Sequence, residues 1–211
     1  KLVNMIMLMA PIGVFALITK TITTLAVGEG GEANLGQIGT VLGALSYYCI
    51  AVIIGLLLHT TIVYLGLLKL FTPLKISQFF KAIAPAQLLA FSTSSSGATL
   101  PVTMRQCKEK LGASKETTSF VLPLGATINM DGTALYQAVA AVFIAQAYSI
   151  PLDLGAQITI ILTAVMASIG TAAVPGAGII MLVIILEAIN VPTAGIALIL
   201  GVDRILDMLR T

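Results

Sequence analysis

The sequence predicts an all-α integral membrane protein with interrupted transmembrane helices. Of its 211 residues, 58% are apolar and only 9% are charged, and the mean hydropathy is +1.05. A soluble domain carries about 25% charged residues, and a disordered chain is poor in apolar residues, so both classes are excluded. The net charge of +2, without a basic run interleaved with aromatic residues, argues against a nucleic-acid partner.

Long uncharged stretches define the expected spans, because a membrane-spanning helix needs about 20 apolar residues. Residues 2–19 form a first candidate span, with a kink expected at Pro11. Residues 33–68 suit one long or strongly tilted helix that ends near Phe71. The only histidine, His59, lies inside this second span, where a packed or pore-facing imidazole is favoured over a catalytic one.

The next uncharged stretch, residues 82–104, is broken in its middle by residues 91–101, which are rich in Ser, Gly and Pro. In lipid the freed backbone groups have no partner, so such a segment must be buried in protein or line a wet cavity. Each half is too short to span a bilayer, so we expect a re-entrant helical hairpin at about 76–110. A basic cluster in this region faces the cytoplasm under the positive-inside rule and consists of Arg105, Lys108, Lys110 and Lys115.

Two further segments show the same kind of interruption. Residues 117–152 form a span interrupted at 127–133, where Asp131 is the only charge. A second re-entrant hairpin is expected at about 153–190 and is broken at 168–176. A final helix begins near Ala194 and carries Asp203, Arg204, Asp207 and Arg210.

The two broken hairpins resemble each other in sequence. The string SGATLP at 96–101 is similar to GTAAVP at 170–175, at an offset of 74 residues, and the same offset carries Asn129 onto Asp203. Interrupted apolar segments at corresponding positions of two halves indicate an inverted-repeat transporter fold with its binding site at the breaks.

The final helix carries Asp203, Asp207 and Arg210 at i, i+4 and i+7, which places them on one face. A charge that faces lipid at the centre of a helix costs about 2.5–3.5 kcal/mol, so this face must meet protein, water or a ligand. In one interpretation Asp207 and Arg210 simply pair with each other. In the other, Arg210 binds a carboxylate and Asp207 an ammonium group, while backbone N–H groups around Ser96 and Gly178 hold a second carboxylate. That combination of groups describes an acidic amino acid.

The interruption at 127–133 suits a cation. An unwound turn there would free the carbonyls of Gly125, Thr127 and Asn129, and Asp131 would supply an anionic oxygen. Hard cations prefer oxygen ligands of this kind. The rival interpretation, that Asp131 only caps the following half-helix, is compatible with a role as a ligand.

Four strings resemble the dicarboxylate/amino acid:cation symporter family, which is the glutamate/aspartate transporter family. They are SSSGATLP at 94–101, NMDGT at 129–133, GTAAVPGAG at 170–178 and DRILDMLRT at 203–211, in the family's order. The resemblance covers nearly the whole chain, from the family's fifth membrane helix to the middle of its eighth. It indicates a fragment of a prokaryotic member.

The resemblance implies a homotrimer in the cell inner (plasma) membrane, in which a transport domain carries the substrate by an elevator motion. Residues 1–27 would form a transmembrane helix of the static scaffold, and residues 36–211 most of the transport domain. The implied function is symport of L-aspartate or L-glutamate with Na⁺ or H⁺, without an organic cofactor and without enzymatic activity. By motif position, the substrate would be bound by Ser94, Ser96, Thr133, Val174, Gly178, Asp207, Arg210 and Thr211, and sodium by Gly125, Thr127, Asn129, Met130, Asp131, Ser168, Ile169 and Thr171.

Several positions depart from the family pattern. The family's Asn and Asp shortly after the position of Thr211, and its third membrane helix, lie outside this sequence, so one sodium site and one substrate contact are incomplete. Some members carry an arginine in the first hairpin or beside Asp207, where this sequence has Ser94 and Met208, with Arg204 one turn earlier. Proton-coupled glutamate symport, C4-dicarboxylate symport and an ion channel therefore stay open as alternatives. A membrane-embedded hydrolase is disfavoured because the serines show no nucleophile-elbow pattern.

Overall fold

The computed structural model describes residues 12, 15, 16, 19 and 35–211, and every regular element in that part of the chain is a helix. Apart from those four single positions, the scaffold helix expected at 1–27 lies outside the described residues. Two described stretches, Leu42–Phe71 and Lys115–Ala147, are long and apolar enough to cross a membrane. The all-α fold class is therefore confirmed, whereas the re-entrant nature of the hairpins stays a prediction.

The first long helix runs without interruption to residue 71, as predicted. It ends before Thr72, whose backbone is extended (φ −134°, ψ 148°), because Pro73 disfavours helical backbone at the residue before it. A π-helical turn in its middle contains four consecutive β-branched residues, 60–63, which lose side-chain freedom in an α-helix. Its three parts are α2 (Leu35–Leu58), the π-helical η1 (His59–Tyr64) and α3 (Leu65–Phe71).

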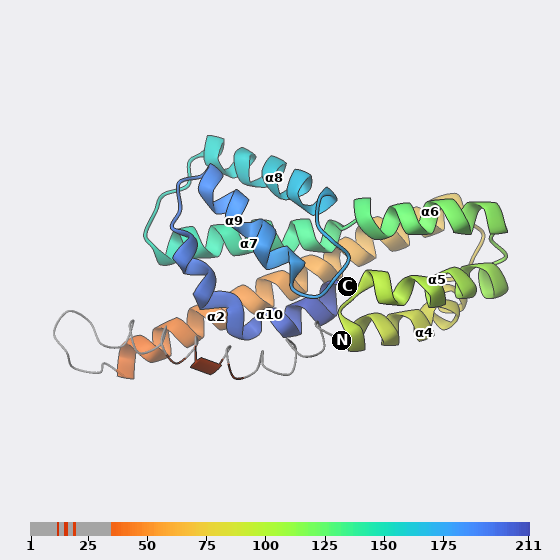
Figure 1. Cartoon of the computed structure of the whole chain (residues 1–211), viewed down its shortest axis with the longest axis horizontal. Helices are drawn as coiled ribbons and strands as arrows, with labels where there is room; N and C mark the ends of the chain where they lie inside the picture. The colour runs from red at the N-terminus through yellow and green to blue at the C-terminus, as the bar shows by residue number, and fades with distance from the viewer. Residues whose placement is uncertain (1–11, 13–14, 17–18, 20–34) are drawn as a thin grey trace.

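The first hairpin consists of two antiparallel helices, α4 (Ile76–Thr93) and α5 (Ser96–Leu111), which pack against each other (Figure 1). Only Ser94 and Ser95 separate them. Ser94 is left-handed (φ 50°), and the hydroxyl of Ser95 caps α5 by accepting the N–H of Ala98 at 3.2 Å. The break expected over residues 91–101 is therefore wrong in extent. Pro101 lies inside α5, although an interior proline removes one backbone hydrogen bond from a helix.

The remaining breaks lie where the sequence predicts them. Asn129 and Met130 alone separate α6 from α7, and the turn 170–176 separates α8 from α9, ending at left-handed Gly176 (φ 75°). A short 3₁₀ turn, η2 (Thr193–Gly195), leads into the last helix. The helices are α6 (Lys115–Ile128), α7 (Asp131–Ala147), α8 (Leu154–Ile169), α9 (Ala177–Ala188) and α10 (Ile196–Arg210).

The two similar strings do not occupy equivalent places. Residues 96–101 lie inside α5, whereas residues 170–175 form the turn between α8 and α9. Asn129 and Asp203, which the same offset relates, also differ in their places: Asn129 lies in a break and Asp203 lies inside α10. The inverted repeat stays a prediction, and the similarity of the strings does not by itself mark equivalent positions.

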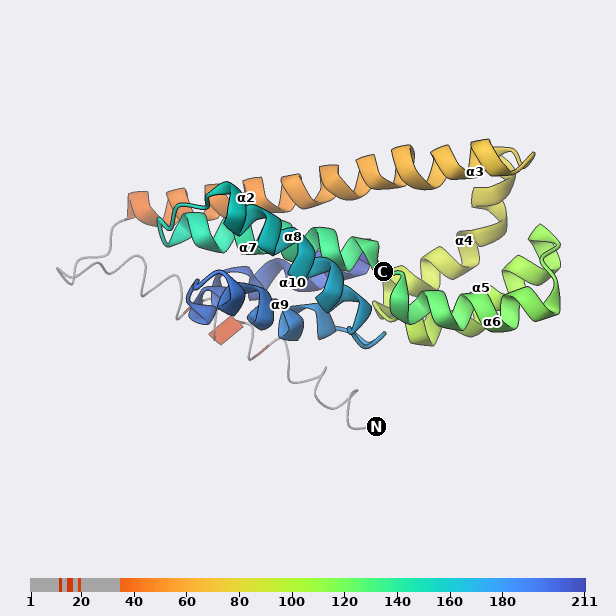
Figure 2. The same cartoon turned by 90° about the horizontal axis from the view of Figure 1, so that it is seen from above.

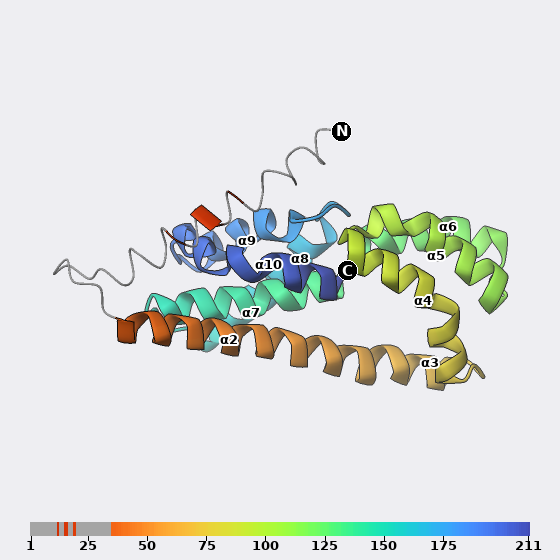
Figure 3. The same ribbon diagram turned by 90° about the horizontal axis from the view of Figure 1, so that it is seen from below.

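The helices form two groups that meet at the hairpin tips. The α2 part of the long helix and α7–α10 surround the buried core, and α4, α5 and α6 form a second group beside the α3 end of the long helix (Figures 1 and 2). The C-terminal residue lies between the two groups in all three views (Figure 3). The largest fully buried core side chains include Val52, Tyr136, Ile144, Ile160, Leu182, Ile185, Leu186, Ile199 and Leu206.

Candidate functional site

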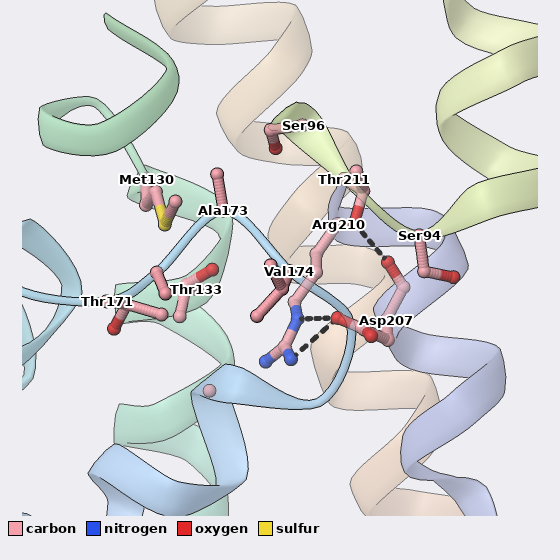
Figure 4. A pocket seen from close by; sticks show the side chains of 12 residues that line it. Ser94, Ser96, Met130, Thr133, Thr171, Ala173, Val174, Asp207, Arg210 and Thr211 are labelled. Carbon is pink, nitrogen blue, oxygen red and sulfur yellow. Dashed lines mark hydrogen bonds and ion pairs between the residues drawn. The ribbon is translucent and has the colours of Figure 1, made fainter. Parts of the chain in front are cut away.

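Asp207 and Arg210 form a buried ion pair on one face of α10 (Figure 4). Oδ1 of Asp207 accepts hydrogen bonds from Nε of Arg210 at 3.0 Å and from Nη2 at 2.8 Å. The two side chains are 7% and 3% exposed, respectively. The pairing of Asp207 with Arg210, which was one of the two interpretations of the sequence, is therefore present. It is not self-contained, because Nη1 of Arg210 is buried and has no hydrogen-bond partner among the described residues.

The other carboxylate oxygen of Asp207 connects α10 to the second hairpin. Oδ2 accepts a hydrogen bond from the backbone N–H of Gly176 at 3.0 Å, at the point where the turn leads into α9. It also lies 4.0 Å from Nη1 of Arg204, whose side chain is 39% exposed. Arg204, one turn before the buried pair, thus places a second, partly exposed positive charge near the carboxylate of Asp207.

The guanidinium of Arg210 is held from two sides. Its Cζ lies 4.0 Å from the ring centroid of Tyr136, a cation–π distance, and Tyr136 is fully buried. On another side, a Cβ built on Gly178 would lie 2.7 Å from both Nη1 and Nη2. A residue with a side chain at position 178 therefore cannot coexist with this position of the guanidinium.

The tips of the two hairpins are bonded to each other. The carbonyl of Ala173, in the turn of the second hairpin, accepts a hydrogen bond from the hydroxyl of Ser95 at 2.9 Å and another from the N–H of Gly97 at 3.2 Å. Ser95 therefore both caps α5 and connects it to the second hairpin. This contact closes the region around Arg210 from the side of the first hairpin.

A cavity of about 20 Å³ lies between these tips and α10, which is room for roughly one water molecule. Every residue that motif position assigned to the substrate lines it, and so do two of those assigned to sodium, Met130 and Thr171. An amino acid needs more space, so binding one requires the tips to separate or the Asp207–Arg210 pair to open. The lining residues are Ser94, Ser96, Met130, Thr133, Thr171, Ala172, Ala173, Val174, Gly178, Asp207, Arg210 and Thr211 (Figure 4).

Two helices, α5 and α9, begin at this cavity. Ser96 is the first residue of α5, and Gly178 is the second residue of α9. The first N–H groups of a helix and its dipole favour negative charge. The backbone groups that the sequence assigned to a second carboxylate are thus brought to the same cavity as Arg210.

Asp131 faces away from this cavity, toward the π-helical turn. Its Oδ2 lies 3.3 Å from Nε2 of His59 and accepts a hydrogen bond from the hydroxyl of Tyr64 at 3.1 Å. The imidazole packs against the Tyr64 ring, as the packed alternative for His59 predicts. The interpretation of Asp131 as only a helix cap does not hold, because Met130 occupies the N-cap position and no side chain caps α7.

The other residues assigned to sodium lie on two elements that contact each other, α6 and α8, and in the breaks that follow them. The carbonyl of Gly125 is not free, contrary to expectation, because it accepts the N–H of Asn129 at 2.9 Å, which leaves only its second lone pair for a cation. The carbonyl of Thr127 is among the last four of α6, which have no partner within the helix. Ser168 and Ile169 end α8 and Thr171 follows in the turn, with the Thr171 N–H bonded to the Ser168 carbonyl at 3.1 Å.

Asp203 is separate from the cavity although it shares the face of Asp207 and Arg210. Its side chain is buried, and Oδ1 has no hydrogen-bond partner among the described residues. Sequence reasoning did not anticipate the roles of Tyr136, Ala173, Gly176 and Tyr64. Only Tyr136 has a signal that could have found it, since it follows Thr133 by three residues and so lies on the same helix face.

The sequence is similar to known proteins along its whole length. A model described as the sodium:dicarboxylate symporter family matches residues 1–211. The chain belongs to the sodium:dicarboxylate symporter family. The symporter resemblance drawn from the four strings is thereby confirmed.

Several named relatives are similar along the whole chain. Excitatory amino acid transporter 1 of Homo sapiens and that of Ambystoma tigrinum are both 46% identical over 211 residues, which is 100% of this chain and 37% of each relative. Excitatory amino acid transporter 2 of Homo sapiens is 44% identical over the same 211 residues, 35% of its length. The chain therefore spans just over a third of these relatives. They are transporters, which agrees with the expectation that this symporter-family chain is not an enzyme.

Proposed function

We propose that the protein containing this chain is a secondary active symporter of acidic amino acids, L-aspartate or L-glutamate, driven by co-transported cations, with Na⁺ as the coupling ion. One observation carries the proposal: a buried arginine, with one guanidinium nitrogen unpartnered, pairs with an aspartate where two broken hairpins meet. The family name and the excitatory amino acid transporters support the same cargo and ion. No organic cofactor and no enzymatic step are part of the proposal.

In this proposal Arg210 binds the side-chain carboxylate of the amino acid and Asp207 its ammonium group. The helix N-termini at Ser96 and Gly178 hold the α-carboxylate. The bound amino acid would replace the pairing between Asp207 and Arg210. Its ammonium group would pair with Asp207, and its side-chain carboxylate would pair with Arg210. Further hydroxyl and backbone contacts come from Ser94, Thr133, Val174 and Thr211.

The cations would be held by backbone carbonyls at the two interrupted helices and by Asp131. Carbonyl and carboxylate oxygens suit a hard monovalent cation, and Met130 adds a weaker thioether contact at the cavity. The residues proposed as ligands are Gly125, Thr127, Asn129, Met130, Asp131, Ser168, Ile169 and Thr171.

For the whole protein we propose a multi-pass homotrimer in the inner (plasma) membrane, with residues 1–27 in the scaffold and residues 36–211 in a moving transport domain. The second hairpin, about 153–190, would act as the gate. The small cavity supports a gate, because separation of the tips at Ala173 is one of the two movements that would make room for an amino acid. An elevator motion would then carry the loaded site across the membrane.

The deciding experiment is uptake of radiolabelled L-aspartate into vesicles that contain the full-length protein. Sodium is replaced by choline at fixed pH, and succinate and L-serine are tested as competitors. We expect saturable uptake that requires sodium and is inhibited by L-glutamate more strongly than by succinate or serine. Uptake that persists in choline and follows an inward proton gradient would establish proton coupling instead. Stronger inhibition by succinate would indicate a C4-dicarboxylate carrier, and flux that rises linearly with concentration a channel.

A further inference from the structure

The basic residues of the described chain are concentrated at one end of the molecule. At this end α3 ends, α4 begins, α5 ends and α6 begins, on the side away from the core (Figures 1 and 2). Each of these basic side chains is exposed. We call this surface the basic end, and it consists of Lys69, Lys75, Lys81, Arg105, Lys108, Lys110 and Lys115.

The charges of the basic end are not balanced by the protein. Only Glu109 and Glu116 lie in the same region, and within the described part of the chain none of the basic-end side chains makes an ion pair. An ordinary water-exposed surface normally carries basic and acidic side chains interspersed with each other. Three of the cations, Lys69, Lys108 and Lys110, lie in the last turn of a helix, where they compensate its dipole. The helix dipole does not account for the other four.

Large apolar side chains lie directly beside these cations. Leu70 and Phe71 are each 75% exposed and lie between Lys69 and Lys75 in the chain. Phe120, in the second turn of α6, is 71% exposed. Lysine stems lie along apolar surface while the ammonium group reaches outward, so this combination fits the boundary between acyl chains and headgroups. A water-soluble acidic partner would satisfy the cations and leave these apolar side chains exposed.

We propose that the basic end binds the phosphate groups of anionic phospholipids in the membrane leaflet that it faces. Its ammonium groups contact the headgroups, and its exposed apolar side chains contact the upper acyl chains. Each lysine or arginine near an anionic membrane surface contributes about 1 kcal/mol. The site is remote from the hairpin tips, so the proposal does not depend on which solute the protein carries.

The test measures binding of acyl-chain-labelled phosphatidylglycerol to the full-length protein, by fluorescence anisotropy in an uncharged detergent. We expect unlabelled phosphatidylglycerol to displace the probe far better than phosphatidylcholine does, and binding to weaken as salt is raised. The double variant Lys108→Gln/Lys110→Gln should bind about 30-fold more weakly, which corresponds to the loss of two cations. An unchanged elution volume on gel filtration and an unchanged unfolding temperature serve as the check that this variant folds.

The matched control is Gln146→Glu/Thr193→Glu, which lowers the net charge by the same amount at the opposite end, near Asp153 and Glu187. Its binding of phosphatidylglycerol should equal that of the wild type. Equal displacement by phosphatidylcholine, unchanged binding in the Lys108/Lys110 variant, or an equal loss in the control would each overturn the proposal. So would displacement by inorganic phosphate, or by a short RNA, at lower concentrations than phosphatidylglycerol, because the site would then accept free anions.

Discussion

The guanidinium of Arg210 lies 4.0 Å above the ring centroid of Tyr136, so the charged group of α10 rests on an aromatic face of α7. Tyr136 is fully buried, and a desolvated cation–π contact contributes up to about 2 kcal/mol. We therefore expect Tyr136→Leu to weaken L-aspartate binding about 5- to 30-fold, as measured by isothermal titration with the full-length protein. Tyr136→Phe keeps the ring and should bind nearly as the wild type does; an equal loss in both variants would contradict the cation–π role.

Arg210 is expected to decide between acidic and neutral substrates. Arg210→Cys removes the only buried guanidinium among the described residues and leaves Asp207 to bind an ammonium group. We predict that uptake of L-aspartate is lost and that uptake of neutral amino acids such as L-serine increases, measured in vesicles with both labelled substrates. Unchanged aspartate affinity in this variant would remove Arg210 from the site.

A side chain at position 178 is expected to push the guanidinium of Arg210 aside, because a Cβ there would lie 2.7 Å from two of its nitrogens. Gly178→Ala should therefore displace Arg210 and weaken L-aspartate binding about tenfold or more, a change of ~1.4 kcal/mol. The control is Gly66→Ala, in α3, where a Cβ would meet nothing within 4 Å. That variant should bind normally and unfold at an equal or higher temperature, because alanine favours helix by up to ~1 kcal/mol. Normal binding in Gly178→Ala would show that the guanidinium has other positions available.

The hydroxyl of Tyr64 is expected to position Asp131 for a cation. Tyr64→Phe removes a hydrogen bond to a carboxylate, and such bonds contribute about 1.5–3 kcal/mol. We predict that the sodium concentration for half-maximal uptake rises, while the maximal rate at saturating sodium changes little. Tyr47→Phe is the matched control, since Tyr47 is 77% exposed and lies on the same long helix. A lower maximal rate with unchanged sodium dependence would refute the positioning role.

Ser95 is expected to hold the two hairpin tips together. Ser95→Ala removes both the hydrogen bond to the Ala173 carbonyl and the cap of α5, and the loss of such a cap costs about 1 kcal/mol. In a Val174→Cys background, it should increase the rate of labelling by a membrane-impermeant maleimide about fivefold. Ser92→Ala, which removes a bond within α4 only, should leave the rate unchanged. If both variants label at the same rate, Ser95 does not restrain the tip.

Patterns along the chain predicted the helices and the residues that share a helix face. The uncharged stretches located the long helix, because burial in lipid demands long apolar runs. The polar and glycine-containing strings predicted breaks at 127–133 and 168–176, which the structure narrows to 129–130 and 170–176. The i, i+4 and i+7 spacing placed Asp207 and Arg210 together on α10. The extent of the first break was predicted too broadly, since proline and glycine content does not reveal that Ser95 caps the following helix.

Contacts between distant segments could not be predicted from the sequence. Tyr64 and Asp131 are 67 residues apart, and Ser95 and Ala173 are 78 residues apart. Periodicity specifies which side of a helix a residue occupies, but not which neighbour covers that side. The size of the cavity was equally inaccessible, because it depends on the side-chain conformations of Arg210 and its neighbours rather than on residue type.

The ion pair between Asp207 and Arg210 also has a consequence for charge balance during transport. As long as the two side chains neutralise each other, this buried pair carries no net charge. An acidic amino acid adds one net negative charge, and moving an unbalanced charge into a low-dielectric environment is costly. In the proposed transport cycle, one accompanying monovalent cation would restore the neutrality of the unloaded site, which gives an electrostatic reason for the proposed cation coupling.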